Sequence, residues 1–425
     1  MAHETVRLAE YAAALRYEDL PAPVAQQAKD CIIDTVAAAI CGSALPWSRI
    51  VIDYAERTGP GGAWISAPAA ALANGALAHA FELDSLTRPG AGAHPGATVL
   101  PPALAVAQEK GADGRGLIAA FVAGNEVMIR IGRATGHTNE ARGFHAPGTT
   151  GPFGATVTAG HLLGLDAGAM TNALGIAGSL CGGLLEFARG NGGMVKRLHL
   201  GRASEAGVLA ASLAAGGFTG PRTVIEGQFG FLRVFCTAWD EAELTRGLGE
   251  EFLVSTTVLK RYPCHATAHP AVRAVRELQA EHGFAAAAVE AITVTATERM
   301  IERHNILEPA DLMLAQYSIP FSVALGLCRE ARDPESWDET ALADPQIRSL
   351  CRRVRLVRGG ELSAVTIALT DGRRLERRAE NGMLESGKLT DKFQRLTRAV
   401  LGERGATLYE RLLGLEDERS LEWLG

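Results

Sequence analysis

The sequence predicts a mainly α-helical protein with a smaller α+β unit in its C-terminal half. Along the 425-residue chain, apolar residues recur at three- and four-residue spacing from the start to about residue 240, as in packed helices. Hydrophobic residues make up 47% and aromatic residues only 6% of a chain rich in Ala and Gly, which suits closely packed helices better than sheets. Alternating β-branched residues become evident after about residue 265, so we expect the strands there.

Three N-terminal segments illustrate the helical pattern. Residues 21–43, PAPVAQQAKDCIIDTVAAAICGS, open with Pro and close near a Gly, which are the usual residues at the two ends of a helix. Residues 97–111 and 113–136 repeat the same apolar spacing. We therefore expect a helix in each segment.

A further stretch, residues 167–185, carries no charged side chain and is long enough to span a bilayer. Its many Ala, Gly, Ser, Thr and Asn residues make it only weakly hydrophobic, and Asp166 and Glu186 enclose it. We expect a helix buried in the protein rather than a membrane span. The N-terminal residues also lack the apolar core of a signal peptide, so we expect a cytoplasmic protein.

The C-terminal half combines strands and helices. Residues 288–297 predict a strand, and residues 362–379 predict a β-hairpin that turns at Asp371 and Gly372. The tail after about residue 390 is helical again. The expected domains are therefore a large helical one, residues 1–265 plus 396–425, and a smaller α+β one, residues 266–395.

Composition excludes several classes of protein. A net charge of −6 argues against a dedicated nucleic-acid binder, which has a basic excess. The seven cysteines are scattered without a CxxC pair, as in a reduced protein, and supply no clustered ligands for an iron–sulfur centre. The chain shows no P-loop and no GxGxxG between a strand and a helix.

The stretch KRYPCHATAHP, residues 260–270, has three interpretations. The first is a metal site, because His265 and His269 are four residues apart and share a face if the segment is helical, with Cys264 adjacent. However, Lys260 and Arg261 would repel a dication. The second is a structural role at the start of a helix, and the third is the wall of a pocket.

Two more stretches concentrate groups that can bind anions and transfer protons. Residues 82–96 contain acids, a cation and a histidine, and residues 196–211 contain cations and a histidine at the end of a charge-poor region. The residues are Glu82, Asp84, Arg88, His94, Lys196, Arg197, His199 and Arg202. His145, in GFHAPGTTGPFG, is a further candidate. If these groups converge, their cations suit a small polycarboxylate, and a His or Asp can move a proton.

Four stretches together resemble the MmgE/PrpD family over nearly the whole chain. They are NGALAHAFELD with HPGATVLPPALA, GFHAPGTTGPFGATVTAGHLLGLD, MVKRLHLGRASEAGVLAASLAAGGFTGP with EGQFGFL, and KRYPCHATAHPAV. The resemblance implies a large helical domain built from both termini, a smaller α+β lid domain, a site between them and a homodimer. Members include 2-methylcitrate dehydratases, cis-aconitate decarboxylases and iminodisuccinate epimerases, which act on small polycarboxylates without a required cofactor.

The resemblance also implies which residues form the site. The catalytic group corresponds to Asp84, His94, Lys196 and His269. Glu82 and His265 are the second choices beside Asp84 and His269, and His199 accompanies Lys196. The family often has DFDDT where this chain has Glu82-Leu83-Asp84-Ser85-Leu86, and Arg88 lies within that departure. An aromatic hydroxyl used by some members falls on Phe321, which has none.

We therefore expect a lyase of the dehydratase type, similar to 2-methylcitrate dehydratase, that needs no cofactor and no metal. Lys196, Arg88 and Arg197 would hold carboxylates, His94 and His269 would move protons, and Asp84 would orient a histidine or act as the base. The alternatives are an epimerase or isomerase of an iminodisuccinate-like substrate, a decarboxylase of a cis-aconitate-like substrate, and a non-catalytic polycarboxylate binder. We expect neither nucleic acid nor a membrane as a partner.

Overall fold

The computed structural model describes residues 3–58, 65–88, 92–189, 192–359, 364–379, 381–385 and 387–424. Its contacts divide the chain into two compact units. Unit 1 consists of Met1–Ala80, Asp84–Leu259 and Thr397–Gly425, and unit 2 of Phe81–Leu83 and Lys260–Leu396. The fold is mainly α with a small sheet in the C-terminal part, which confirms the predicted fold class. The predicted lid role of the 266–395 domain stays a prediction.

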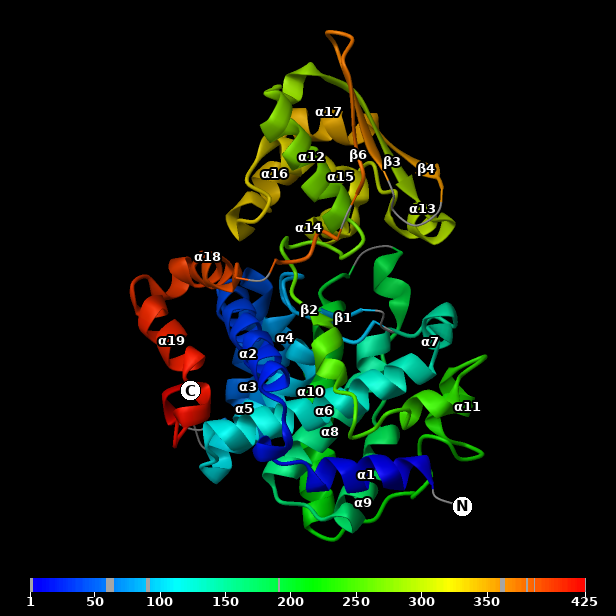
Figure 1. Cartoon of the computed structure of the whole chain (residues 1–425), viewed down its shortest axis with the longest axis vertical. Helices are drawn as coiled ribbons and strands as arrows, with labels where there is room; N and C mark the ends of the chain where they lie inside the picture. Colours follow the sequence, from blue (N-terminus) through cyan, green and yellow to red (C-terminus); the bar gives the residue numbers. More distant parts are fainter. Residues whose placement is uncertain are drawn as a thin grey trace. The chain divides into compact units, whose positions relative to one another are not determined.

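Unit 1 is built almost entirely from helices (Figure 1). They are α1 (Glu4–Ala14), α2 (Ala22–Ser43), α3 (Pro46–Thr58), α4 (Ala67–Ala78), α5 (Pro95–Lys110), α6 (Gly114–Ala134), α7 (Thr138–Ala141), α8 (Ala146–Leu162), α9 (Ala167–Gly178), α10 (Val195–Ala215), α11 (Phe231–Phe235) and α19 (Arg404–Leu413). A two-stranded antiparallel ladder pairs β1 (Leu86–Thr87) with β2 (Thr257–Val258).

The predicted helices of unit 1 are confirmed, with ends explained by local chemistry. Residues 21–43 form α2, whose first turn contains a proline. Residues 97–111 form α5, which stops at Gly111 because that residue adopts the left-handed conformation (φ 65°). Residues 113–136 form α6, which starts where the Asp113 side chain accepts a hydrogen bond from the Gly116 amide.

The apolar stretch 167–185 is helical over only part of its length. Helix α9 ends at Gly178, and the chain is irregular up to Leu184. Met170, Ala173 and Leu174 are fully buried, as expected for a helix inside the protein. Within the described residues no single helix is both long and apolar enough to cross a membrane, and α2 with α3 meets that test only as a pair bent by 97°.

Close packing at Gly201 brings α4 and α10 together. A Cβ at Gly201 would lie 2.4 Å from the Leu72 carbonyl oxygen, so the helices touch backbone to backbone. Helix α10 also packs on α8, and α8 on α6, which forms the core of unit 1. This packing places the start of α10, with Lys196, near the end of α4, just before His79.

Unit 2 packs helices on a four-stranded sheet. The strands are β3 (Val289–Ala296), β4 (Val354–Arg358), β5 (Val365–Leu369) and β6 (Arg374–Arg377), in the order β4-β3-β5-β6, with β3 and β4 parallel and the other pairs antiparallel. The helices α12 (His269–His282), α15 (Ile319–Cys328) and α17 (Pro345–Arg353) contact this sheet (Figure 1). The remaining helices are α13 (Glu298–His304), α14 (Leu312–Tyr317) and α16 (Glu339–Ala343).

The predicted strand and hairpin of unit 2 are confirmed. Strand β3 lies within residues 288–297, and β5 and β6 form the hairpin around Asp371 and Gly372, where Gly372 has φ 87°. Leu362 and Ser363, at the start of the predicted hairpin, lie outside the described residues. Helix α18 (Leu389–Leu401) begins in unit 2, and its last residues belong to unit 1.

Candidate active site

The carboxylate of Asp84 lies between two imidazoles in unit 1. Its Oδ1 is 2.7 Å from Nδ1 of His79, and its Oδ2 is 2.8 Å from Nδ1 of His94. The two rings meet edge to face with centroids 5.0 Å apart. Asp84 and His79 are buried, whereas the His94 side chain keeps 13% of its surface exposed. His94 is therefore the imidazole of this group that a small molecule can reach.

Helix ends position these three residues. Helix α4 stops at Ala78, and His79 and Ala80 turn out of it through amides that bond to Gly75 and Leu77. His94 directly precedes Pro95 at the start of α5, and Thr98 donates its hydroxyl to the His94 carbonyl at 2.8 Å. The triad thus lies where α4 ends and α5 begins.

Burial and charge set the protonation of the group. Burial alone would raise the pKa of Asp84, but the two imidazoles beside it hold that pKa well below 3.8. Burial lowers the pKa of His79 well below 6.5, and the Lys196 ammonium lowers it further, against the opposing effect of Asp84. Asp84 is therefore an anion near neutral pH, and it accepts the Nδ1–H of a neutral His79.

Two more histidines and a lysine extend the cluster. His145 precedes α8, and its Nδ1 lies 3.0 Å from Nδ1 of His199 on α10. Burial lowers the pKa of His145 well below 6.5, and His199, His79 and His94 lower it further. Burial also lowers the pKa of His199, and Lys196 adds to this effect. Lys196, the second residue of α10, is itself buried.

The cluster lies at the N-terminal ends of three long helices. His94 precedes α5, His145 precedes α8, and Lys196 lies in the first turn of α10. The N-terminus of a helix carries partial positive charge and unpaired backbone amides, both of which favour anions. With the ammonium of Lys196, these helix ends make the surroundings of His94 suitable for a negatively charged ligand.

A cavity of about 500 Å³ adjoins His199 in unit 1. This volume is in the range of small-molecule sites. Apolar residues such as Phe187 and Leu198 form much of its wall, Glu186 and Arg202 supply charge, and His199 supplies an imidazole. A small molecule in this cavity would contact the imidazole of His199.

Three residues predicted to bind substrate have other contacts, and Arg197 is the first of them. It donates to the carbonyls of Ala80 at 2.8 Å and Gly193 at 3.0 Å, and its guanidinium lies 4.9 Å from the centre of the Trp47 ring. These contacts support the turn before Asp84, and the substrate-binding role of Arg197 stays a prediction.

Glu82 and Arg88, which were also predicted to bind substrate, have other contacts as well. The carboxylate of Glu82 is engaged by Lys260 at 2.7 Å, with both side chains buried in unit 2. The backbone amide of Arg88 donates to the carbonyl of Thr256, and burial lowers the pKa of its guanidinium. The substrate-binding roles of Glu82 and Arg88 stay predictions.

The histidines of KRYPCHATAHP lie in unit 2 and differ in access. His269 is fully buried at the start of α12, where Nε2 lies 3.2 Å from the Cys264 carbonyl. His265 is half-buried and stacks on His304 with ring centroids 4.2 Å apart. His265 is thus the more accessible of the two, and the catalytic role of His269 stays a prediction.

The ring of a tyrosine lies close to His265 in unit 2. The ring of Tyr317 is 5.0 Å from that of His265. Phe321, to which the sequence assigned this position, is buried with its ring 6.3 Å from that of Trp337. Tyr317 is therefore an aromatic residue with a hydroxyl whose ring neighbours that of His265.

Metal ligation was one of three interpretations of residues 260–270. Within the described part of the chain, the group of potential metal ligands that lies close enough together is instead His79, Asp84 and His94. Two ligands of a tetrahedral zinc ion at about 2.1 Å would lie about 3.4 Å apart. The nitrogen–oxygen distances of 2.7 and 2.8 Å are shorter and fit direct hydrogen bonds.

Sequence reasoning missed His79 as a member of the cluster, although it lies within the quoted stretch NGALAHAFELD. Its place at the end of an apolar helix, five residues before Asp84, was the available signal. By contrast, Asp84, His94, Lys196 and His199 were proposed from separate stretches, and the structure brings them into one cluster.

The fold and the cluster define a mainly helical protein with a histidine–carboxylate group suited to proton transfer near an anion. A model of the MmgE/PrpD N-terminal domain matches residues 6–243, and a model of the MmgE/PrpD C-terminal domain matches residues 262–413. The chain belongs to the MmgE/PrpD family.

Several curated relatives are named cis-aconitate decarboxylase. The protein of that name from Aspergillus terreus is 34% identical over 304 residues, which are 65% of this chain and 60% of the relative. The one from Homo sapiens is 27% identical over 355 residues, 78% of this chain and 72% of the relative. A cis-aconitate decarboxylase-like protein oryM from Aspergillus oryzae is 31% identical over 305 residues, 65% of this chain and 61% of the relative. The match thus spans about 60% of the length of the fungal relatives.

Proposed function

We propose that the protein is a lyase that acts on a small di- or tricarboxylate by acid–base proton transfer next to a carboxylate. The observation that carries this proposal is the bridge from His79 through Asp84 to His94, with the Lys196 ammonium close enough to lower the pKa of His79. An ionised carboxylate that orients a partly exposed imidazole is an arrangement suited to general acid–base catalysis.

Each group has a distinct role in this proposal. Asp84 accepts Nδ1–H of His94, which leaves Nε2 as the atom that gives or takes the proton of the substrate. Buried His79 holds the other oxygen of Asp84 and so fixes the carboxylate. Lys196 and the helix N-termini attract the substrate carboxylates and stabilise negative charge that develops on the reacting carbon.

The finer candidate is decarboxylation of a cis-aconitate-like substrate. In that reaction the bond from carbon to one carboxylate breaks, CO₂ leaves, and the electron pair left on carbon takes up a proton. The names of the relatives favour this alternative over the dehydratase activity that the sequence placed first. The ring of Tyr317 lies beside that of His265, and we propose that its hydroxyl serves the role for which Phe321 has none.

Dehydration and epimerisation remain competing outcomes because both also need a proton moved next to a carboxylate. A non-catalytic polycarboxylate binder is the alternative outside enzymes, and it would bind the same ligands without converting them. We keep the homodimer as a prediction, which sedimentation of the purified chain tests.

Proton NMR in D₂O tests the proposed function. The protein, with and without EDTA treatment, is incubated with cis-aconitate, 2-methylcitrate, citrate and iminodisuccinate. We expect a product or deuterium uptake that survives EDTA and falls at least about 100-fold in Lys196→Ala, since removal of one preorganised charge costs a few kcal/mol. Loss of CO₂ identifies a decarboxylase, loss of water a dehydratase, and exchange without net loss an epimerase. Binding by thermal shift without any turnover would contradict the proposal.

A further inference from the structure

The three residues before Asp84 are held by unit 2. Contacts assign Phe81–Leu83 to this unit, whereas Ala80 and Asp84 on either side belong to unit 1. Each of the three accepts a hydrogen bond from a different side chain: Phe81 O from Gln316 Nε2 at 3.3 Å, Glu82 Oε2 from Lys260 Nζ at 2.7 Å, and Leu83 O from Lys392 Nζ at 2.8 Å. Each of the three residues that precede Asp84 is therefore held by a hydrogen bond from a side chain of unit 2.

Two of these contacts involve buried ammonium groups. Lys392 is 5% exposed and Lys260 is 1% exposed. A buried ammonium is costly unless it is paired or hydrogen-bonded, and its bonds to oxygen are stronger than neutral ones. These hydrogen bonds also hold an unfavourable backbone conformation. Glu82 has φ 57°, in the left-handed region that non-glycine residues rarely adopt.

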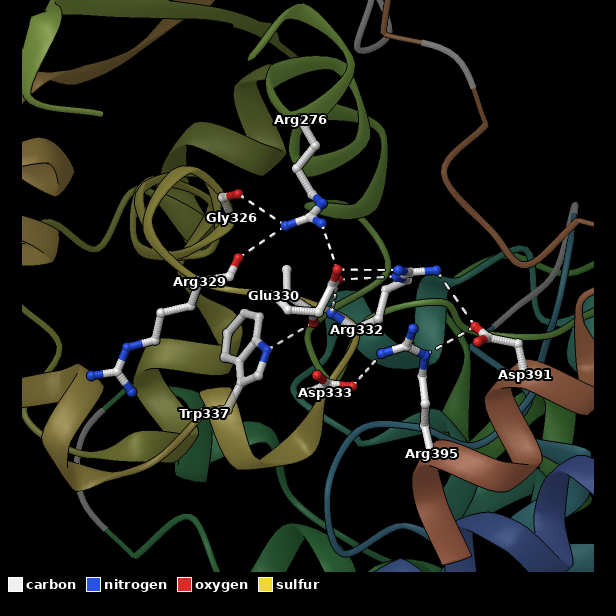
Figure 2. Close-up of polar contacts among 10 residues, drawn as sticks. Arg276, Gly326, Arg329, Glu330, Arg332, Asp333, Trp337, Asp391 and Arg395 are labelled. Atoms are coloured by element: carbon white, nitrogen blue, oxygen red, sulfur yellow. Dashed lines mark hydrogen bonds and ion pairs between the residues drawn. The ribbon is translucent and has the colours of Figure 1, made fainter. Parts of the chain in front are cut away.

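The part of α18 that carries Lys392 is held by ion pairs of its neighbours Asp391 and Arg395 (Figure 2). Asp391 and Arg395, which flank Lys392 on α18, pair with each other at 3.0 Å. Arg395 also pairs with Asp333, and Asp391 pairs with Arg332 at 3.5 Å. The first turns of α18 are thus tied to the segment that follows α15.

That segment is tied in turn to the helices of unit 2. Glu330 accepts from Arg332 at 3.0 Å and from Arg276 of α12 at 2.8 Å (Figure 2). Arg276 also donates to the carbonyls of Gly326 and Arg329, at 3.2 and 2.9 Å. The network therefore joins the first turns of α18, which carry Lys392, to α12 and to the end of α15.

We propose that Lys392 is a positioning residue for Asp84. The carbonyl of Leu83 lies in the same rigid peptide plane as the amide nitrogen and Cα of Asp84. By fixing this carbonyl, Lys392 fixes the plane that holds the amide nitrogen and Cα of Asp84, the atoms from which its side chain reaches His79 and His94. The inference rests on the proposed function for its effect on turnover, but not for its effect on these hydrogen bonds.

The test compares Lys392→Met, which removes the ammonium at similar length, with Lys392→Arg, which keeps a cationic donor. Lys388→Met is the matched control, since Lys388 is exposed and lies one helical turn earlier. Two readouts are recorded on the full chain: kcat and KM, and the ring Nδ1–H resonances of His79 and His94 by ¹⁵N NMR, assigned with His79→Gln and His94→Gln.

In Lys392→Met we expect at least one of the two Nδ1–H resonances to shift or broaden. We expect kcat to fall about 10- to 100-fold, as for a misplacement on the order of 1 Å, with KM changed less than about threefold. Lys392→Arg should recover part of kcat and part of the original Nδ1–H resonances. Lys388→Met should match the wild type in both measurements. If Lys392→Met does not fold, Lys392→Gln, which keeps a polar side chain but removes the ammonium bonded to the Leu83 carbonyl, should give the same shift.

Unchanged resonances in Lys392→Met would overturn the inference, whether or not kcat or the unfolding temperature falls. If the wild type converts none of the substrates, the proposed function fails, and the resonances alone then decide whether Lys392 positions Asp84.

Discussion

Nδ1 of His94 lies 2.8 Å from Oδ2 of Asp84, whose other oxygen is occupied by His79. The Asp84 carboxylate therefore orients the accessible imidazole of His94, while the buried imidazole of His79 fixes the carboxylate. This arrangement differs from a simple histidine–aspartate pair because the Asp84 carboxylate has both oxygens engaged and cannot rotate without breaking a buried hydrogen bond.

Replacing Asp84 with Asn tests the orienting carboxylate. The variant keeps the volume of the side chain but removes the charge that accepts both Nδ1–H groups, so we expect turnover to fall about 10²–10⁴-fold. Asp166→Asn is the control, because Asn caps a helix as well as Asp does at the start of α9. An Asp84→Asn enzyme with more than a tenth of wild-type kcat would show that the carboxylate is dispensable.

His94 and His79 should differ in their effect on turnover. His94 is partly exposed and His79 is buried, so we assign proton transfer to His94 and support of Asp84 to His79. We expect His94→Gln to lower kcat about 10²–10⁴-fold, and His79→Gln, which retains a donor to Asp84, to lower it less. Steady-state kinetics of both variants test this assignment. A loss of kcat in His79→Gln equal to or larger than that in His94→Gln would reverse it.

The buried carboxyl of Glu126 should make stability depend on pH. Burial raises its pKa from 4.5 to about 7, against the lowering effect of Arg130. Between these values the unfolded chain has lost the proton that the folded protein keeps, so the free energy of unfolding falls as pH rises, by up to about 3 kcal/mol.

Glu126→Gln removes this titration. We expect the difference in unfolding free energy between wild type and variant, measured by urea denaturation, to move in favour of the variant from pH 5 to pH 8. A difference that is independent of pH over this range would mean that Glu126 titrates normally in the folded protein.

Gly201→Ala should disrupt the packing that brings Lys196 toward His79. Its Cβ would lie 2.4 Å from the Leu72 carbonyl, so α4 and α10 must separate, at a cost of about 1–3 kcal/mol. Gly168→Ala in α9 is the control, because there a Cβ meets a single atom at 3.3 Å. We expect a lower unfolding temperature and lower kcat for Gly201→Ala, and neither loss for Gly168→Ala. Equal behaviour of the two variants would contradict the packing argument.

Helices and strands were predictable wherever short-range chemistry decides them. The apolar spacing and end residues of α2, α5 and α6 lie within each segment, as do the alternation of β3 and the turn at Gly372. The stretch 167–185 was predicted as one helix and is helical only to Gly178, because its many small residues permit a helix without specifying its length.

The members of the site were partly predictable and their contacts were not. Residue types alone indicated Asp84, His94 and Lys196, but Arg197 bonds to the Ala80 carbonyl and Glu82 pairs with Lys260. Nothing local distinguishes a cation that binds substrate from one that holds a backbone carbonyl more than a hundred residues away.

Patterns along the chain were enough to establish the helical class, the sheet in the C-terminal part, the family, and the chemical types available for proton transfer and anion binding. Periodicity, end residues and motifs act within a few residues, so they can be read along the chain. The tertiary structure alone decided that His79 shares Asp84 with His94, that His145 meets His199, and that Lys392 holds Leu83. Those relationships join distant segments through close packing and buried hydrogen bonds, which exist only once the chain has folded.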